Sequence, residues 1–129
     1  MALRYKLEDA CHMAIVEYLR NVLPMAEIVH VPNEGKRSPF EAARQKRLGL
    51  RPGAADLIVF LPKLVVAIEV KRPADKETNR RAGRATDAQI EFGMNLNSMG
   101  HPFFIAQSID DVRHALAALG IETREVVAS

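Results

Sequence analysis

The sequence contains a single cysteine, Cys11, and no long run of apolar residues. One cysteine excludes a disulfide within the chain and is typical of a protein from a reducing compartment. No stretch approaches the roughly 18 consecutive apolar residues of a transmembrane helix, and no charged-then-apolar signal peptide opens the chain. Internal repeats and low-complexity segments are also lacking. We therefore expect a cytoplasmic protein without a membrane partner.

The composition is that of an ordinary folded domain. The 129 residues are 48% apolar and 26% charged, which suffices for a sizeable hydrophobic core. No linker-like segment divides the chain. We predict a single domain over residues 1–129.

Apolar periodicity and turn residues predict eight elements in the order α-β-α-β-β-α-β-α. The predicted helices are Leu7–Leu23, Pro39–Leu48, Thr86–Met99 and one from Ser108 or Asp110 to Leu119. The predicted strands are Glu27–Val31, Asp56–Leu61, Leu64–Val70 and Phe103–Gln107, with a polar turn over Pro32–Gly35. This order predicts the α/β class, a mixed β-sheet covered by helices.

The two central strands are separated only by Pro62 and Lys63. An antiparallel hairpin turning symmetrically about these residues places Asp56 directly opposite Glu69, with Cβ atoms roughly 4.5–5.5 Å apart. Strand alternation puts Lys71 on the same face as Glu69. Two facing carboxylates destabilise a sheet unless a cation lies between them. A divalent metal with oxygen ligands meets that need, so the hairpin predicts a metal site.

Basic residues are concentrated on either side of this hairpin. Twelve of the 18 lysines and arginines fall in two short stretches. They are Lys36, Arg37, Arg44, Lys46, Arg47 and Arg51, then Lys71, Arg72, Lys76, Arg80, Arg81 and Arg84. Positive charge around a metal site suits a polyanion such as nucleic acid. The alternative is two solvated loops without a ligand.

Helical phase selects a third carboxylate. At 100° per residue, Ile15, Leu19 and Val22 fall within about 40° of Glu8, whereas Glu17 points to the opposite side. Glu8 therefore lies on the buried stripe of the first helix, where a carboxylate needs a partner or a metal. Stabilisation of the first helical turn by the helix dipole is the alternative.

The same test applied to the helix after Thr86 directs Gln89 inward, at the edge of the face that carries Phe92 and Leu96. A buried amide needs hydrogen-bond partners. Either backbone groups satisfy it, or it holds Lys71 or a substrate phosphate.

Together these residues resemble a known family. The segments NEGKRSPFEAARQKRLGLRPGAADLIVF, IEVKRP and DAQIEFGMNLNSMG are similar to the motifs of the PD-(D/E)XK nuclease superfamily. Within it they resemble the virus-type replication-repair nucleases, the VRR-NUC family, over roughly Leu7 to Ala115. One departure is Ala55, where the family usually has proline before the aspartate.

The resemblance implies a restriction-endonuclease-like fold and a role for each residue. Glu8, Asp56, Glu69 and the Val70 carbonyl would bind Mg²⁺ or Mn²⁺, Lys71 would orient or deprotonate the attacking water, and Gln89 would position Lys71. The residues implied for phosphate contacts are Lys36, Arg37, Arg44, Lys46, Arg47 and Arg72. The spacing of the four histidines (His12, His30, His101 and His114) makes no zinc-type cluster, so we expect neutral bystanders, with His12 one turn after Glu8 the one to watch.

The implied function is a metal-dependent, structure-selective DNA endonuclease. Stand-alone members of the family resemble Holliday-junction resolvases, so we expect branched DNA as substrate, a homodimer, and a phage or prophage setting in bacterial cytoplasm. Two alternatives stay open. One is the same chemistry on flaps, duplex or RNA, and the other is a catalytically silent nucleic-acid-binding module. The intact set of Asp56, Glu69 and Lys71 argues against the silent module.

Overall fold

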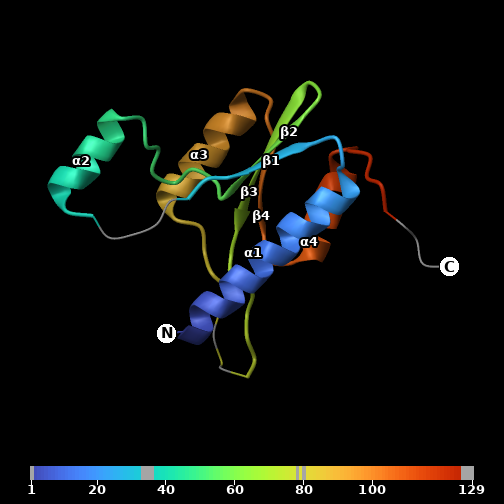
Figure 1. The fold of residues 1–129 in the computed structure, drawn as a ribbon, viewed down its shortest axis with the longest axis horizontal. Coiled ribbons are helices and arrows are strands. Elements are labelled where there is room, and N and C mark those ends of the chain that lie inside the picture. The colour runs from blue at the N-terminus through green and yellow to red at the C-terminus, as the bar shows by residue number, and fades with distance from the viewer. Residues whose placement is uncertain (1, 33–36, 78, 80, 126–129) are drawn as a thin grey trace.

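The computed structural model describes residues 2–32, 37–77, 79 and 81–125, and the side chains from residue 8 onward (Figure 1). Its helices are α1 (Ala2–Val22), α2 (Pro39–Arg47), α3 (Asp87–Ser98) and α4 (Ile109–Ala118). Its strands are β1 (Glu27–His30), β2 (Leu57–Leu61), β3 (Leu64–Val70) and β4 (Phe103–Ala106). The predicted order of elements and the mixed α/β class are confirmed.

The four strands form one sheet in the order β1-β2-β3-β4. Strands β1, β2 and β3 run antiparallel, whereas β3 and β4 are parallel. The hairpin register is the predicted one, because Leu57 pairs with Ile68 and Leu61 with Leu64. Lys63 takes the positive φ of 65° that closes the two-residue turn.

The hydrophobic core lies between one face of the sheet and helices α1 and α4 (Figure 1). Ile15 and Leu19 of α1 and Leu116 of α4 pack there against Leu57 and Ile68. Because strand side chains alternate, Ala67 and Glu69 belong to the opposite face. Helix α3 covers that opposite face over β3 and β4, and this arrangement places the hairpin's carboxylates between the sheet and α3.

Helix α3 approaches β4 closely at a glycine. A Cβ atom added to Gly93 would lie 2.3 Å from Cδ2 of Phe103, well inside van der Waals contact. The ring of Phe103 also meets Phe92 edge-to-face at 6.4 Å between centroids. Gly93 therefore sets the distance between α3 and the sheet.

The helix ends follow local sequence signals. Ser38, Thr86 and Ser108 cap α2, α3 and α4, so Ser108 and not Asp110 begins the last helix. Helix α1 begins at Ala2, before the predicted Leu7, because residues 2–6 contain no helix-breaking glycine or proline. Of the predicted polar turn, residues 33–35 lie outside the described part of the chain.

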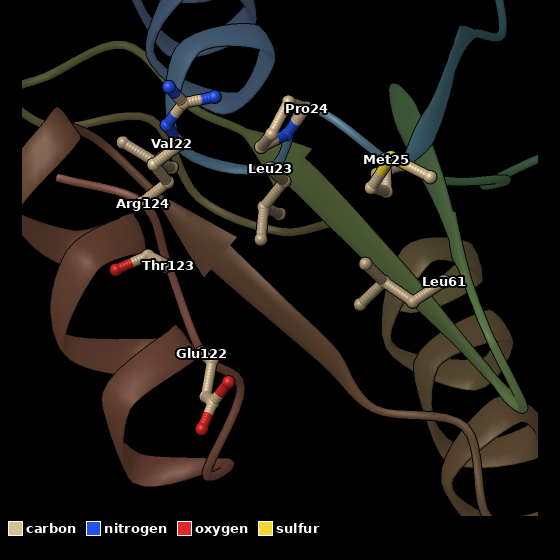
Figure 2. A pocket seen from close by; sticks show the side chains of 9 residues that line it. Val22, Leu23, Pro24, Met25, Leu61, Glu122, Thr123 and Arg124 are labelled. Carbon is tan, nitrogen blue, oxygen red and sulfur yellow. The ribbon is translucent and has the colours of Figure 1, made fainter.

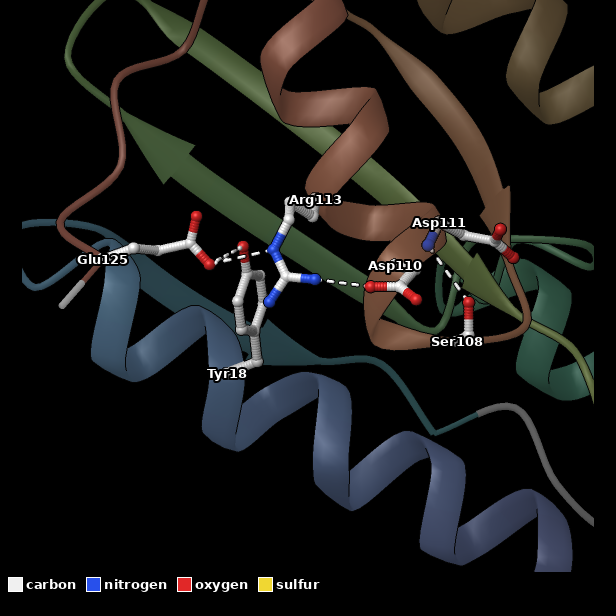
Figure 3. Close-up of polar contacts among 6 residues, drawn as sticks. All are labelled: Tyr18, Ser108, Asp110, Asp111, Arg113 and Glu125. Atoms are coloured by element: carbon white, nitrogen blue, oxygen red, sulfur yellow. Dashed lines mark hydrogen bonds and ion pairs between the residues drawn. The ribbon is translucent and has the colours of Figure 1, made fainter. Parts of the chain in front are cut away.

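Polar contacts fasten the C-terminal segment to the helices (Figure 3). Glu125 accepts hydrogen bonds from the Tyr18 hydroxyl and from Arg113 Nε, each at 3.0 Å. The Arg113 guanidinium lies 5.3 Å from the Tyr18 ring centroid and also pairs with Asp110. These contacts tie α1, α4 and the segment after α4 together on the core side.

Cys11 of α1 faces the end of β4. Its Sγ donates to the Gln107 carbonyl across 3.2 Å, and burial, the largest cause, raises the pKa of the thiol above 9.0. The thiol is therefore a protonated structural group at neutral pH.

A hollow of about 260 Å³ lies at the turn end of the hairpin (Figure 2). It is bounded by the end of α1, by Leu61 and by residues 122–124. The charged residues of the hairpin lie at the other end of the same strands. Among the residues that the structure describes, no helix is both long and apolar enough to cross a bilayer.

Candidate functional site

Two carboxylates face each other at the open end of the hairpin. Asp56 immediately precedes β2 and Glu69 is the penultimate residue of β3, so the confirmed register sets them opposite one another. Glu69 is only 3% exposed. Burial first, and the charge of Asp56 second, raise the pKa of Glu69 from 4.5 to about 7, against the opposing effect of Lys71. The predicted like-charge pair is therefore present and partly buried.

One oxygen of Glu69 is held firmly and the other is not. Oε2 accepts a hydrogen bond from Gln89 Nε2 at 2.8 Å and lies 3.3 Å from Lys71 Nζ. Oε1 is buried and has no hydrogen-bond partner within the described part of the chain. A buried carboxylate oxygen without a donor is costly, so this atom has the environment of a ligand to a cation.

Asp56 is fixed through both its backbone and its side chain. Its Oδ2 accepts from the Val70 amide at 2.9 Å. Its carbonyl accepts from the Val31 amide at 2.8 Å and from His30 Nδ1 at 3.0 Å. Val70, expected to offer its carbonyl to a metal, thus has its amide committed to the Asp56 carboxylate.

Gln89 performs two functions at the start of α3. Its side-chain Oε1 accepts from the Thr86 backbone N–H at 2.8 Å, and its backbone N–H donates to the Thr86 hydroxyl. These two hydrogen bonds form a capping box. Its Nε2 is thereby directed to Glu69. Gln89 and Lys71 meet on the same Glu69 oxygen, so the residue that Gln89 contacts directly is Glu69.

Two histidines that we expected to be bystanders lie beside Asp56. His30 donates to the Asp56 carbonyl, and the ring of His12 meets the His30 ring edge-to-face at 4.6 Å between centroids. Burial first, and His30 second, lower the pKa of His12. His30 reaches Asp56 because β1 pairs with β2, a pairing that sequence spacing alone does not reveal. The sequence signal for this position is side-chain alternation within β1, which puts His30 and Ile28 on the core face.

Glu8 occupies the helical phase that the sequence predicts. It is half-buried, whereas Glu17 is exposed. The charges of Glu8 and Asp56 both act on His12, so the three side chains belong to one neighbourhood. No group of three or more His, Cys, Asp or Glu side chains with metal-binding geometry occurs among the described residues. The structure thus assembles Asp56 with Glu69, and the participation of Glu8 stays a prediction.

The donor set suits a divalent cation with hard oxygen ligands. Asp56 and Glu69 provide carboxylate oxygens, one of them the unpartnered Oε1 of Glu69. Mg²⁺ and Mn²⁺ prefer such ligands. A cation would also relieve the repulsion that raises the pKa of Glu69.

The basic residues expected at phosphates occupy two places. Arg37, Arg44, Lys46 and Arg47 are exposed on or just before α2, where Arg44 pairs with Glu41 at 3.1 Å. Arg72 follows Lys71 at the site and has a buried Nη1 that lacks a partner among the described residues. Lys36 lies outside the described part of the chain.

Comparison with solved structures finds the same architecture in a VRR_NUC domain protein. The two chains superpose with a TM-score of 0.62 over 87% of this chain and 86% of the other, at 23% sequence identity. The chain has the VRR_NUC fold. No protein-family model matches the sequence, and no curated protein is detectably similar to it. The resemblance inferred from the sequence motifs is therefore supported by the three-dimensional structure.

Ala55 is the position at which the sequence departs from the motif pattern of the family it resembles. Ala55 is completely buried beside Asp56. The carbonyl of the following Asp56 accepts from Val31 and His30.

Proposed function

We propose that this chain is a metal-dependent nuclease of the PD-(D/E)XK type that hydrolyses phosphodiester bonds in DNA. One observation carries the proposal. Glu69 is buried between Asp56 and Lys71, has one oxygen without a partner among the described residues, and has a pKa raised to about 7. Perturbed, partly buried carboxylates beside a lysine are typical of a catalytic site and costly in a purely structural one.

Asp56 and Glu69 would hold Mg²⁺ or Mn²⁺, with Glu8 and the Val70 carbonyl as the further ligands that the resemblance implies. When bound, such a cation supplies Lewis acidity toward a phosphate oxygen and lowers the pKa of water. Asp56 contributes a carboxylate whose position is fixed by the Val70 amide. Glu69 contributes Oε1, while its Oε2 stays engaged with Gln89 and Lys71.

Lys71 acts on the attacking water and on the phosphate. Its Nζ, 3.3 Å from Glu69 Oε2, is a mostly buried cation at the end of β3. At that position the ammonium orients the water and offsets the negative charge that develops on the phosphate, whereas taking the proton of the water would require the neutral amine form of Lys71. Gln89 keeps Glu69 in place and so fixes the position of Lys71 indirectly.

For the substrate we propose branched DNA of the Holliday-junction kind, cut by a homodimer. A junction has two scissile phosphates related by a two-fold axis, and a symmetric dimer presents one site to each. The exposed basic residues Arg37, Arg44, Lys46 and Arg47 would contact phosphates without reading sequence. Flaps, duplex and RNA are the alternative substrates. We place this activity in the replication and repair of a phage or prophage in bacterial cytoplasm.

The test is cleavage of labelled junction, flap, duplex and single-stranded RNA with Mg²⁺, Mn²⁺ or EDTA. We expect cutting of the junction only when a divalent cation is present, and none by Lys71→Ala. Glu17→Ala, which removes an exposed carboxylate on the far side of α1, serves as the matched control and keeps activity. Cleavage that continues in EDTA, or in Lys71→Ala, would overturn the mechanism. Binding without cleavage by the native protein would identify a silent module.

A further inference from the structure

Helix α2 stands away from the rest of the chain. It has nine residues, none of them buried, and none belongs to the core cluster. In Figure 1 it projects beyond α3, which separates it from the hairpin of β2 and β3. Isolated helices shorter than about 12–15 residues are marginal in water, and most helical stability in proteins comes from packing. We therefore expect α2 to pack against a second molecule.

One side of α2 is apolar and ready for such packing. Phe40 is 79% exposed, and Leu48 just after the helix is also exposed. With Ala43, Arg44 and Arg47 these residues repeat at helical spacing and line a hollow of about 460 Å³. The hollow is open to solvent along this one side of α2, and it is lined by guanidinium groups as well as by apolar side chains.

The sheet offers a matching apolar strip on the face that carries α3. Strand alternation and the register put Val29, Ile58 and Phe60 on that face, next to the edge of the sheet formed by β1. Val29 is 41% exposed and Phe60 45% exposed, because α3 packs over β3 and β4. Glu27 pairs with Phe60 across the strands and is exposed beside it. The strip is therefore apolar with an acidic margin.

We propose that α2 of one copy packs its Phe40 side onto the strip around Phe60 of a second copy, and that the exchange is reciprocal. The charges are complementary, since Arg47 lines the same hollow as Phe40 while Glu27 borders Phe60, and the dimer contact would take Arg47 out of the set proposed to bind phosphates. Each chain contains both contact surfaces, the Phe40 side of α2 and the strip around Phe60, at separate places in its own fold. A reciprocal exchange closes as a two-fold dimer and leaves neither surface free to recruit a third copy.

This inference rests on the homodimer of the proposed function and names the surface that forms it. Nucleic acid is the alternative ligand for a basic helix with an exposed aromatic residue. The apolar strip on the sheet favours the second copy, because Phe60 pairs with Glu27 and Val65 toward the turn end of the hairpin, away from Glu69, where bare DNA gains nothing from an exposed aromatic side chain.

The experiment is light scattering of the full chain at micromolar concentration without DNA or metal. We expect the native protein to have the mass of two chains, and Phe40→Glu and Phe60→Glu to have the mass of one. Met25→Glu, which places the same charge on an exposed methionine outside both surfaces, is the matched control and stays dimeric. Circular dichroism checks that each variant is folded, and Leu48→Ser supplies a milder change on the α2 side.

Mixing the two monomeric variants tests the reciprocity. Phe40→Glu still carries an intact strip and Phe60→Glu an intact α2, so the mixture forms one native contact per pair and regains part of the dimer mass. A monomeric native protein, or variants that stay dimeric, would overturn the proposal. Variants that stay dimeric but lose junction binding would assign α2 to nucleic acid instead. Because no measurement here involves cleavage, a dimer without nuclease activity contradicts only the proposed chemistry.

Discussion

Gln89 Nε2 donates a hydrogen bond to Glu69 Oε2 across 2.8 Å and so joins the first turn of α3 to the end of β3. The same glutamine closes the capping box of α3 with Thr86. The bond that begins the helix and the bond that orients the carboxylate are therefore made by one side chain. The position of α3 over the sheet and the orientation of Glu69 are coupled through it.

Replacing Gln89 by alanine removes both bonds and should lower cleavage about 10–100-fold, the value of a hydrogen bond to a charged group. Single-turnover kinetics on junction DNA measure this. Thr86→Ala is the matched control, because it weakens the cap of α3 by about 1 kcal/mol without removing the donor to Glu69. Equal loss of cleavage in both variants would mean that only the helix cap matters.

Asparagine and alanine at position 56 should differ in stability although both abolish cleavage. Asp56→Asn keeps an acceptor for the Val70 amide and removes repulsion from Glu69, so metal-free stability stays equal or rises. Asp56→Ala leaves that amide without its acceptor and should cost about 1–3 kcal/mol of unfolding free energy. Urea unfolding in EDTA measures both. A clear stability loss in the asparagine variant would show that the Asp56 charge itself is stabilising.

Glu69 predicts how metal-free stability depends on pH. Its pKa is about 7 in the folded chain and near 4.5 when unfolded, so between these values the folded state holds the extra proton. The contribution of Glu69 is thus fully present below about pH 4.5 and is lost as pH rises through about 7. We expect the Tm measured in EDTA to fall across this pH window in the native protein and to fall less in Glu69→Gln. An identical Tm profile for both proteins would rule out the raised pKa.

The same pKa sets the pH dependence of cation binding. A cation on Glu69 must displace its proton below about pH 7, so affinity should weaken up to about tenfold for each pH unit below that value. Calorimetric titration of the metal-free protein with Mn²⁺ at pH 6 and pH 8 measures it. Equal affinity at the two values would indicate ligands other than Glu69.

His30 should contribute to catalysis through Asp56. Removing its hydrogen bond to the Asp56 carbonyl with His30→Ala should cost a few-fold in kcat at unchanged KM, since a neutral hydrogen bond is worth about 0.5–1.5 kcal/mol. His30→Asn offers an N–H donor in a similar position and should recover part of the loss. Failure of asparagine to improve on alanine would assign His30 a packing role only.

Gly93→Ala should destabilise the fold and disturb the site together. The added methyl group meets the Phe103 ring at 2.3 Å, so α3 or the ring must move, at a cost of about 1–3 kcal/mol. Moving α3 also moves Gln89 away from Glu69. Thermal unfolding checks the first effect and cleavage the second. Ser98→Ala, which changes an exposed side chain at the last residue of α3, is the control.

The sequence predicts the hairpin well because a two-residue turn permits only one register for strands with this pattern. Asp56 opposite Glu69 follows from that register, and the helix starts follow from Ser38 and Thr86, whose side chains act locally. What local signals do not specify is which strands become neighbours. The pairing of β1 with β2 brings His30 to Asp56, so local signals could not predict that contact. The contact between Gln89 and Glu69 likewise depends on how α3 crosses the sheet, so helical phase predicted an inward glutamine but not its partner.

The environment of Cys11 has a practical consequence for labelling. Since it is the sole cysteine, is half-buried, and has a thiol pKa raised above 9.0, it should react slowly with maleimides at neutral pH. A cysteine introduced at an exposed position outside both proposed contact surfaces, such as Met13, would then carry a fluorophore or spin label selectively in an otherwise native background. Distances between labels on different molecules become measurable in solution without first engineering a cysteine-free protein.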